Sequence, residues 1–140
     1  MTKIKFKKKK LYLNLLLGSI WVVLGTLGFI LDEELNVFEY IYIACGALYL
    51  FHFFYDFKYQ YLKIEYNTIQ KNFLYGGSNK KIKFEDIVEV EKTYLNYVLK
   101  TENEKIQVNA DLIEEESYKE FKSILFSLDL PEEKVPKLYV

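Results

Sequence analysis

The longest uncharged stretch of the chain, from Leu11 to Ile30, limits what this sequence can fold into more than any other feature. It reads LYLNLLLGSIWVVLGTLGFI, and only Leu31 separates it from the first acid, Asp32. A helix of roughly 20 mostly apolar residues crosses a bilayer core, so the stretch predicts a transmembrane helix. It exceeds the about 7–15 apolar residues of a signal peptide and offers no small-x-small cleavage site, so we expect the helix to be retained.

A second apolar stretch follows after a short acidic loop. It reads YIYIACGALYLFHFFY from Tyr40 to Tyr55, and extension to Val37 and Phe57 gives it the length of a membrane crossing. The sequence therefore predicts a basic cytoplasmic leader over residues 1–10, a transmembrane helical hairpin over residues 11–57, a cytoplasmic domain over residues 58–130 and a tail over residues 131–140.

Lysines are concentrated before the first span. Residues 1–10 carry six lysines and no acid, residues 32–39 carry four acids and no base, and Lys58 and Lys63 follow the second span. Because Lys and Arg near span ends favour the cytoplasmic side, we expect both termini on the cytoplasmic face of a bacterial inner membrane. The lysines would also attract anionic lipid heads, each by about 1 kcal/mol near the surface, and topology alone explains them equally well.

Small residues occur at similar depth in the two spans, and such residues let membrane helices approach closely. They are Gly25 and Gly28 in the first span and Ala44, Gly46 and Ala47 in the second. We predict that they help to close the hairpin or a larger bundle.

Two ionisable residues of the second span, His52 and Asp56, stand four residues apart and so share one helix face. Ionisable groups within a span are functional candidates, and this pair would relay protons or bind an ion. The alternative is structural: Asp56 lies at the membrane boundary, and His52 snorkels or bonds to Tyr49 or to a backbone carbonyl.

The composition argues against several classes of function. The chain has no Arg, which nucleic-acid readers use for base and phosphate recognition, so no nucleic-acid partner is expected. Cys45 is the only cysteine and His52 the only histidine, so we expect no disulfide, no cysteine metal cluster and no serine triad. Gly76-Gly77 lacks the context of a phosphate-binding loop. We expect no catalysis, no cofactor, no metal and no small-molecule substrate.

From Gln60 onward, apolar residues alternate with polar ones, as in half-buried strands. Short runs separated by polar turns predict an antiparallel meander of six strands. The runs cover residues 62–66, 69–73, 80–84, 87–92, 94–100 and 105–110. Asp111 and Glu114 then make a capping box by residue type, and an amphipathic helix follows to about Leu128, with Pro131 ending it.

This order of elements resembles the small bacterial membrane proteins that carry a pleckstrin-homology-like domain after a transmembrane hairpin. The resemblance covers residues 11 to about 128, and its segments are LKIEYNTIQKNF, KKIKFEDIVEVEK, YLNYVLKT, KIQVNA and the helix. The most telling piece is Ile82-x-Phe84-Glu85-Asp86-Ile87-x-x-Val90, where a strand runs into a turn and a further strand. The resemblance implies a membrane α-hairpin plus an α+β domain, a bent antiparallel sheet of six to seven strands capped by the helix.

In eukaryotic relatives, basic residues around the first strand pair bind phosphoinositides, so the resemblance also implies candidate lipid-binding lysines. They are Lys63, Lys71, Lys80, Lys81 and Lys83. Lys7, Lys8, Lys9 and Lys10 of the leader are further candidates, because they would attract anionic lipid heads. A solvated face near an anionic membrane would explain the same lysines. Bacterial versions more often look like assembly or interaction modules.

Together these features predict a non-enzymatic, inner-membrane-anchored interaction or scaffold protein. Its cytoplasmic domain would present a sheet edge or a helix groove to a protein partner, and strand addition is one mode of such binding. Two alternatives stay open. One is a subunit of an oligomeric membrane complex in a defence, immunity or secretion system, and the other is a module that binds anionic lipid.

Overall fold

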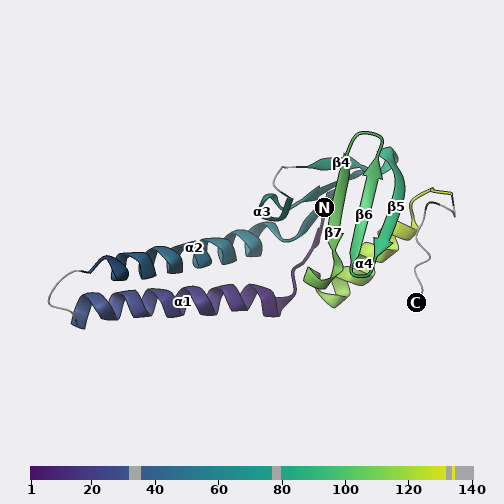
Figure 1. The fold of residues 1–140 in the computed structure, drawn as a ribbon. Coiled ribbons are helices and arrows are strands. Elements are labelled where there is room, and N and C mark those ends of the chain that lie inside the picture. Colours follow the sequence, from purple (N-terminus) through teal and green to yellow (C-terminus); the bar gives the residue numbers. More distant parts are fainter. Residues whose placement is uncertain (32–35, 77–79, 132–133, 135–140) are drawn as a thin grey trace. The chain divides into compact units, whose positions relative to one another are not determined.

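The computed structural model describes residues 1–31, 36–76, 80–131 and 134 of the chain (Figure 1). Residues 77–79 of the expected glycine-rich turn, and the expected tail apart from residues 131 and 134, lie outside this part. The chain divides into a hairpin unit, Lys8–Lys58, and a sheet unit, which combines Met1–Lys7 with the chain from Tyr59 onward.

The hairpin unit consists of two long helices, α1 (Lys8–Leu31) and α2 (Val37–Tyr59). Both are long enough and apolar enough to cross a membrane, as expected from the two apolar stretches. Their large apolar side chains are mostly exposed, for example Leu16, Leu48 and Phe51. Such a surface suits a hydrocarbon solvent rather than water. The first helix begins at Lys8, so three of the leader's lysines form its first turn.

The sheet unit contains two antiparallel sheets rather than the single bent sheet that we expected. The first has the order β1-β2-β3-β4 and the second the order β5-β6-β7. The strands are β1 (Thr2–Ile4), β2 (Leu62–Glu65), β3 (Thr68–Lys71), β4 (Lys81–Lys83), β5 (Ile87–Thr93), β6 (Asn96–Thr101) and β7 (Lys105–Asn109). Three short helical segments, α3 (Phe73–Gly76), η1 (Phe84–Asp86) and η2 (Ala110–Leu112), and the C-terminal helix α4 (Glu115–Phe126) complete it.

Strand β1 was missed in the sequence, where Thr2–Ile4 counted as part of a basic leader. It pairs antiparallel with β2, with Thr2 opposite Ile64 and Ile4 opposite Leu62. The sheet is therefore built from residues on both sides of the helical hairpin. The signal was the alternation in TKIKF, because Ile4 and Phe6 are buried while the lysine between them is exposed.

Several element ends also differ from the predictions. Phe73 and Phe84, expected in strands, begin α3 and η1 instead. The capping box was wrong, because Asp111 lies in η2 and the N-cap of α4 is Glu114, whose side chain makes no cap hydrogen bond. Asp111 donates its own N–H to the Asn109 side chain at 2.9 Å. The turn at η2 therefore precedes α4, and the helix begins later than the sequence pattern predicts.

The core of the sheet unit is formed by large side chains from both sheets and from α4. Tyr61, Tyr97, Phe6 and Phe121 are each at most 1% exposed. Burial of one such side chain contributes about 1.5–3 kcal/mol. The rings of Phe6 and Tyr61 lie 5.2 Å apart, so the segment before the hairpin and the segment after it share one core.

Candidate functional site

The chain leaves the sheet unit and returns to it at neighbouring positions. Tyr61 N–H donates to the carbonyl of Ile4 at 3.1 Å, and Phe6 N–H donates to the Gln60 side chain at 3.1 Å. Gln60 has φ 60°, a left-handed conformation that is uncommon for a residue other than glycine. Lys7 N–H is bonded to a carbonyl of η2 at 2.9 Å. Both ends of the helical hairpin are therefore connected to residues that are held in the sheet unit.

The candidate lipid-binding lysines are divided between the two units. Lys8, Lys9 and Lys10 belong to α1, and the other six belong to the sheet unit. Three of those six lie against carboxylates. Their pairs are Lys7–Asp111 at 2.7 Å, Lys63–Glu65 at 2.8 Å and Lys83–Glu85 at 3.7 Å. Lys80 precedes β4 and Lys81 begins it. Lipid binding by these lysines stays a prediction.

Lys71 has a structural position between the two sheets. Its ammonium donates to the carbonyl of Gln107 on β7 at 2.7 Å and lies 5.7 Å from the centre of the Tyr61 ring. Burial lowers the pKa of Lys71. Next to this contact, Asn109 N–H donates to the Tyr61 hydroxyl at 2.8 Å. Side chains from the first sheet thus satisfy backbone groups on the outer edge of β7.

Within the hairpin unit, glycines rather than alanines make the close contacts. A Cβ atom at Gly46 would lie 2.6 Å from a Val22 methyl group, and one at Gly25 would lie 2.6 Å from the Ile43 side chain. Gly28 packs against Glu39 in the same way. The sequence analysis did not single out Gly18, which packs against Leu50, although it is spaced seven residues before Gly25.

Ala44 and Ala47 are exposed on α2, so they do not close the hairpin. A role in a larger bundle stays a prediction for both. The sequence placed them with Gly46 because all three are small and adjacent, but on a helix only residues three or four apart share a face with one another.

The ionisable residues of α2 lie at its two ends. His52 Nε2 is 3.4 Å from Asp56 Oδ2, and Asp56 is fully buried, so the expected i, i+4 contact is present. At the other end, Glu39 is 5% exposed and its Oε2 has no hydrogen-bond partner. In the sequence, Glu39 is one of the four acids of residues 32–39. Among the described residues, no group of three or more His, Cys, Asp or Glu side chains is placed to hold a metal ion.

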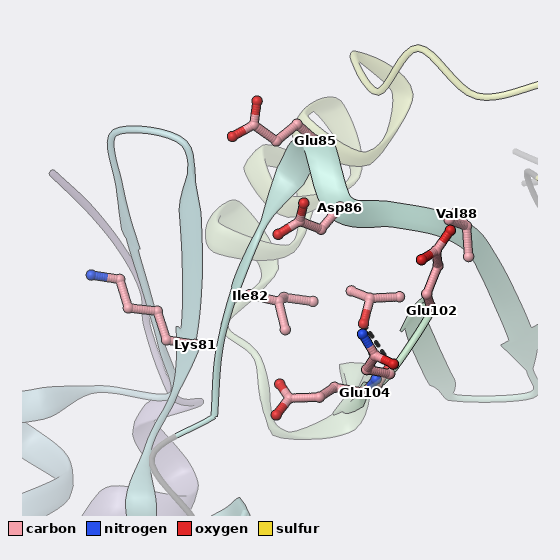
Figure 2. Close-up of a pocket in the computed structure, with 9 residues that line it drawn as sticks. Lys81, Ile82, Glu85, Asp86, Val88, Glu102 and Glu104 are labelled. Carbon is pink, nitrogen blue, oxygen red and sulfur yellow. Dashed lines mark hydrogen bonds between the residues drawn. The ribbon is translucent and has the colours of Figure 1, made fainter.

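The two sheets leave a cleft between them, which we call the β4 cleft (Figure 2). Its volume is about 560 Å³, which falls within the range of binding pockets. In Figure 2 it lies on the side of β4 away from the β2–β3 hairpin, and Ile82, Asp86 and Glu104 point into it. The lining residues are Lys81, Ile82, Glu85, Asp86, Val88, Thr101, Glu102, Asn103 and Glu104.

Sequence reasoning did not find this cleft. The segment Glu85-Asp86 had been assigned to a turn, and 101–104 to a polar hairpin loop. Only folding brings these two turns to opposite walls of one hollow, since 15 residues or more separate Asp86 from the 101–104 turn in the chain. The lining of the cleft combines two apolar side chains, Ile82 and Val88, with four carboxylates.

Comparison of the chain with protein-family models, with curated proteins and with solved structures gives no match.

Proposed function

We propose that this chain is a non-enzymatic interaction protein anchored in the bacterial inner membrane. The helical hairpin is the anchor, and the sheet unit is a pleckstrin-homology-like domain that meets a protein partner on the cytoplasmic side. The observation that carries the proposal is the pairing of β1 with β2, because it ties a folded domain to both ends of an apolar hairpin through linkers of two or three residues.

Two further features support the domain assignment, and a third supports the orientation of the sheet unit. Antiparallel sheets of four and three strands are followed by one amphipathic helix, in the order that the resemblance implies. The helix packs its apolar side, with Phe121 and Leu125, into the core. The basic segment before α1, with the acidic loop after it, supports a cytoplasmic sheet unit through the bias of lysines toward that side.

Orientation is tested by thiol labelling of the full chain in spheroplasts. Tyr94 lies in the turn between β5 and β6 and is 88% exposed, so a Tyr94→Cys variant in a Cys45→Ala background presents one reactive thiol. A membrane-impermeant maleimide should label it only after lysis. Labelling of intact spheroplasts would contradict a cytoplasmic domain.

Partner binding is tested by photo-crosslinking in the native cells. A photoreactive phenylalanine analogue at Tyr66, which is 98% exposed, samples the sheet unit, and the same analogue at Leu16 samples the exposed surface of α1. The proposal expects discrete protein adducts from the sheet unit. A sheet unit whose many exposed positions, tested one by one, give no protein adduct would contradict it.

The second candidate function is a subunit of an oligomeric membrane complex. The exposed Ala44 and Ala47 favour it, since small residues on the outer side of a membrane helix let another helix approach. Native mass spectrometry of the detergent-solubilised protein tests it. A homo-oligomer that dissociates in an Ala44→Leu/Ala47→Leu variant supports this function, and a wild-type monomer contradicts self-assembly.

A further inference from the structure

Strand β4 has an unpaired edge that faces the β4 cleft. In an antiparallel ladder, hydrogen-bonded and non-bonded residue pairs alternate. Phe84 N–H donates to the Asn67 carbonyl, and Lys71 N–H donates to the Lys80 carbonyl. Ile82 lies two residues from Phe84 and two from Lys80, so its backbone N–H and C=O point toward β3. Lys81 therefore turns its N–H and C=O toward the other edge. The neighbouring strand on that side is absent from the described part of the chain, where β4 ends its sheet.

The wall of the cleft opposite β4 is the turn between β6 and β7, and in the described part of the chain it lacks the side-chain contacts that join the two sheets elsewhere along their boundary (the seam). Farther along β7, the edge groups of Gln107 and Asn109 are satisfied by Lys71 and Tyr61. Toward the β6–β7 turn that closure stops, and the cleft opens. The seam is thus closed by side chains at one end and leaves room for added chain at the other.

Charge selects what kind of chain would fit. The lining holds four carboxylates, from Glu85, Asp86, Glu102 and Glu104, and one ammonium, from Lys81. The Lys81 side chain points away from the cleft in Figure 2, and Asp86 and Glu104 point into it. A basic segment is attracted by this lining, and an acidic segment or an anionic lipid surface is repelled.

The cleft also lies at the end of the first sheet that is far from Tyr61, where the chain enters β2. The strand runs about 16 Å from there to the turn at Tyr66, at 3.3 Å per residue. Residue Phe84 at the start of η1 is bonded to Asn67 of that turn at 2.8 Å. The described lining of the cleft therefore includes no residue of the linkers to α1 and α2.

We propose that the β4 cleft binds an extended segment of a partner protein that carries Lys or Arg side chains. The segment adds to the free edge of β4, and its basic side chains meet Asp86, Glu102 and Glu104. This inference rests on the proposed function, because it names the site and the chemistry of the partner. Backbone pairing supplies affinity and the charged pockets supply selectivity, as in other strand-addition complexes.

A defined probe tests the cleft in the full chain. The protein is placed in nanodiscs of phosphatidylcholine, so that no anionic lipid competes, and a fluorescent heptapeptide KVKVKVK is titrated at physiological salt. We expect it to bind at least tenfold more tightly than EVEVEVE. An Asp86→Asn/Glu102→Gln/Glu104→Gln variant should bind KVKVKVK about tenfold more weakly, because three exposed charge contacts are lost.

Two controls separate the cleft from general attraction. A Glu115→Gln/Glu116→Gln/Glu120→Gln variant loses the same charge from the exposed side of α4 and should keep wild-type affinity within about twofold. The peptide KVKPKVK keeps the charge but lacks one backbone N–H, so it should bind several-fold more weakly. Equal losses in the two protein variants, or undiminished binding of the proline peptide, would overturn the proposal, as would a wild-type protein that binds neither peptide.

The cellular crosslinks separate this inference from the function beneath it. If the adducts of the sheet unit persist unchanged in the cleft variant, a partner binds elsewhere, and only the inference fails. If no position of the wild-type sheet unit gives an adduct, the proposed function itself fails.

Discussion

The helix contact of the hairpin unit and the core of the sheet unit are built from different kinds of residue. In the hairpin unit, Gly25 and Gly46 are buried at the contact between α1 and α2, while most large apolar side chains, such as Leu16, are exposed. In the sheet unit, the largest fully buried side chains are those of Tyr61 and Tyr97. One chain therefore combines two apolar helices that meet at glycines with a sheet unit whose core holds large aromatic rings.

The difference fits the proposed function, in which the hairpin unit lies in lipid and the sheet unit in water. In water, burial of large apolar side chains is the main favourable term. In lipid, that term vanishes between helices, and close van der Waals packing takes its place. Loss of a large buried ring should therefore weaken the sheet unit, and enlargement of a buried glycine should separate the two helices.

The largest effect is expected from truncation of Phe6, which is 1% exposed although it lies in a lysine-rich segment. Phe6→Ala should destabilise the sheet unit by about 3–5 kcal/mol, because a large buried ring leaves a cavity. Hydrogen exchange of the β6 amides in the detergent-solubilised full chain should accelerate at least about 100-fold, at 1.4 kcal/mol for each factor of ten.

Lys5→Ala is the matched control for Phe6→Ala. The Lys5 side chain is exposed, and its structural contacts use backbone atoms, such as the N–H that donates to Ser117 at 3.1 Å. Exchange should stay within about threefold of wild type, the scale of a surface substitution. Equal effects at positions 5 and 6 would mean that this segment is not part of the core.

In the hairpin unit, enlargement of a buried glycine should be destabilising, as truncation of a buried ring is in the sheet unit. Gly46→Leu should separate α1 from α2 and destabilise the hairpin unit by about 1–3 kcal/mol. The reason is that a Cβ atom at position 46 would lie 2.9 Å from the Val22 backbone nitrogen. Pulsed EPR between spin labels at Ser19 and Leu48, in a Cys45→Ala background, should show a broader and longer distance distribution.

Ala47→Leu places the same leucine side chain one residue later and is the control. Ala47 is exposed, so the distance distribution should match that of the wild type. A wild-type distribution in both variants would contradict the assigned contact face of α2.

A smaller effect, of opposite sign, is expected at the exposed turns of the sheet unit. Tyr66 and Tyr94 each have φ 52°, a conformation that costs a non-glycine residue about 1–2 kcal/mol. Tyr94→Gly removes this strain with little loss of packing and should stabilise the unit by about 0.5–1 kcal/mol, after the entropy of glycine is subtracted. Slower exchange of the β5 and β6 amides would verify it, and faster exchange would show that the tyrosine ring contributes contacts.

The smallest effect concerns pH and the pair Lys7–Asp111. The hydrogen bond from the Lys7 ammonium lowers the pKa of the Asp111 carboxyl below its usual value. The folded state therefore holds the proton less tightly than the unfolded state, and the stabilisation is present above the unfolded pKa and is lost as pH falls through the folded one. An NMR titration should give a lowered Asp111 pKa in the wild type and a pKa near the usual value in Lys7→Ala. An unchanged Asp111 pKa in that variant would contradict the contact between Lys7 and Asp111.

The coarse architecture could be predicted from the sequence because its signals are local. Twenty uncharged residues predict a long apolar helix, and alternation after Gln60 predicts strands. Strand β1 was missed because three residues carry little periodicity, and because six lysines in residues 1–10 drew attention to charge instead. The interpretation as a basic leader gave no structural role to Ile4 and Phe6, although the fold buries both.

The β4 cleft could not be predicted because it depends on contacts between distant segments. Nothing near Asp86 in the chain indicates that the 101–104 turn would face it. The division of Gly46 from Ala47 likewise depends on the rotation of α2 against α1, which composition does not specify. Features that depend on residue type were visible in the sequence, and features that depend on facing direction were not.

The most direct test of the account is a disulfide between β1 and β2. Lys3 lies opposite Lys63, and directly opposed residues have Cα atoms roughly 4.5–5.5 Å apart, within disulfide reach. Mild oxidation of a Lys3→Cys/Lys63→Cys/Cys45→Ala variant in membranes should link the two cysteines rapidly. A Lys3→Cys/Lys81→Cys/Cys45→Ala variant should not link, since three strand spacings of about 4.8 Å separate β1 from β4. Absence of the first link, or equal formation of both, would contradict a sheet built from both ends of the hairpin.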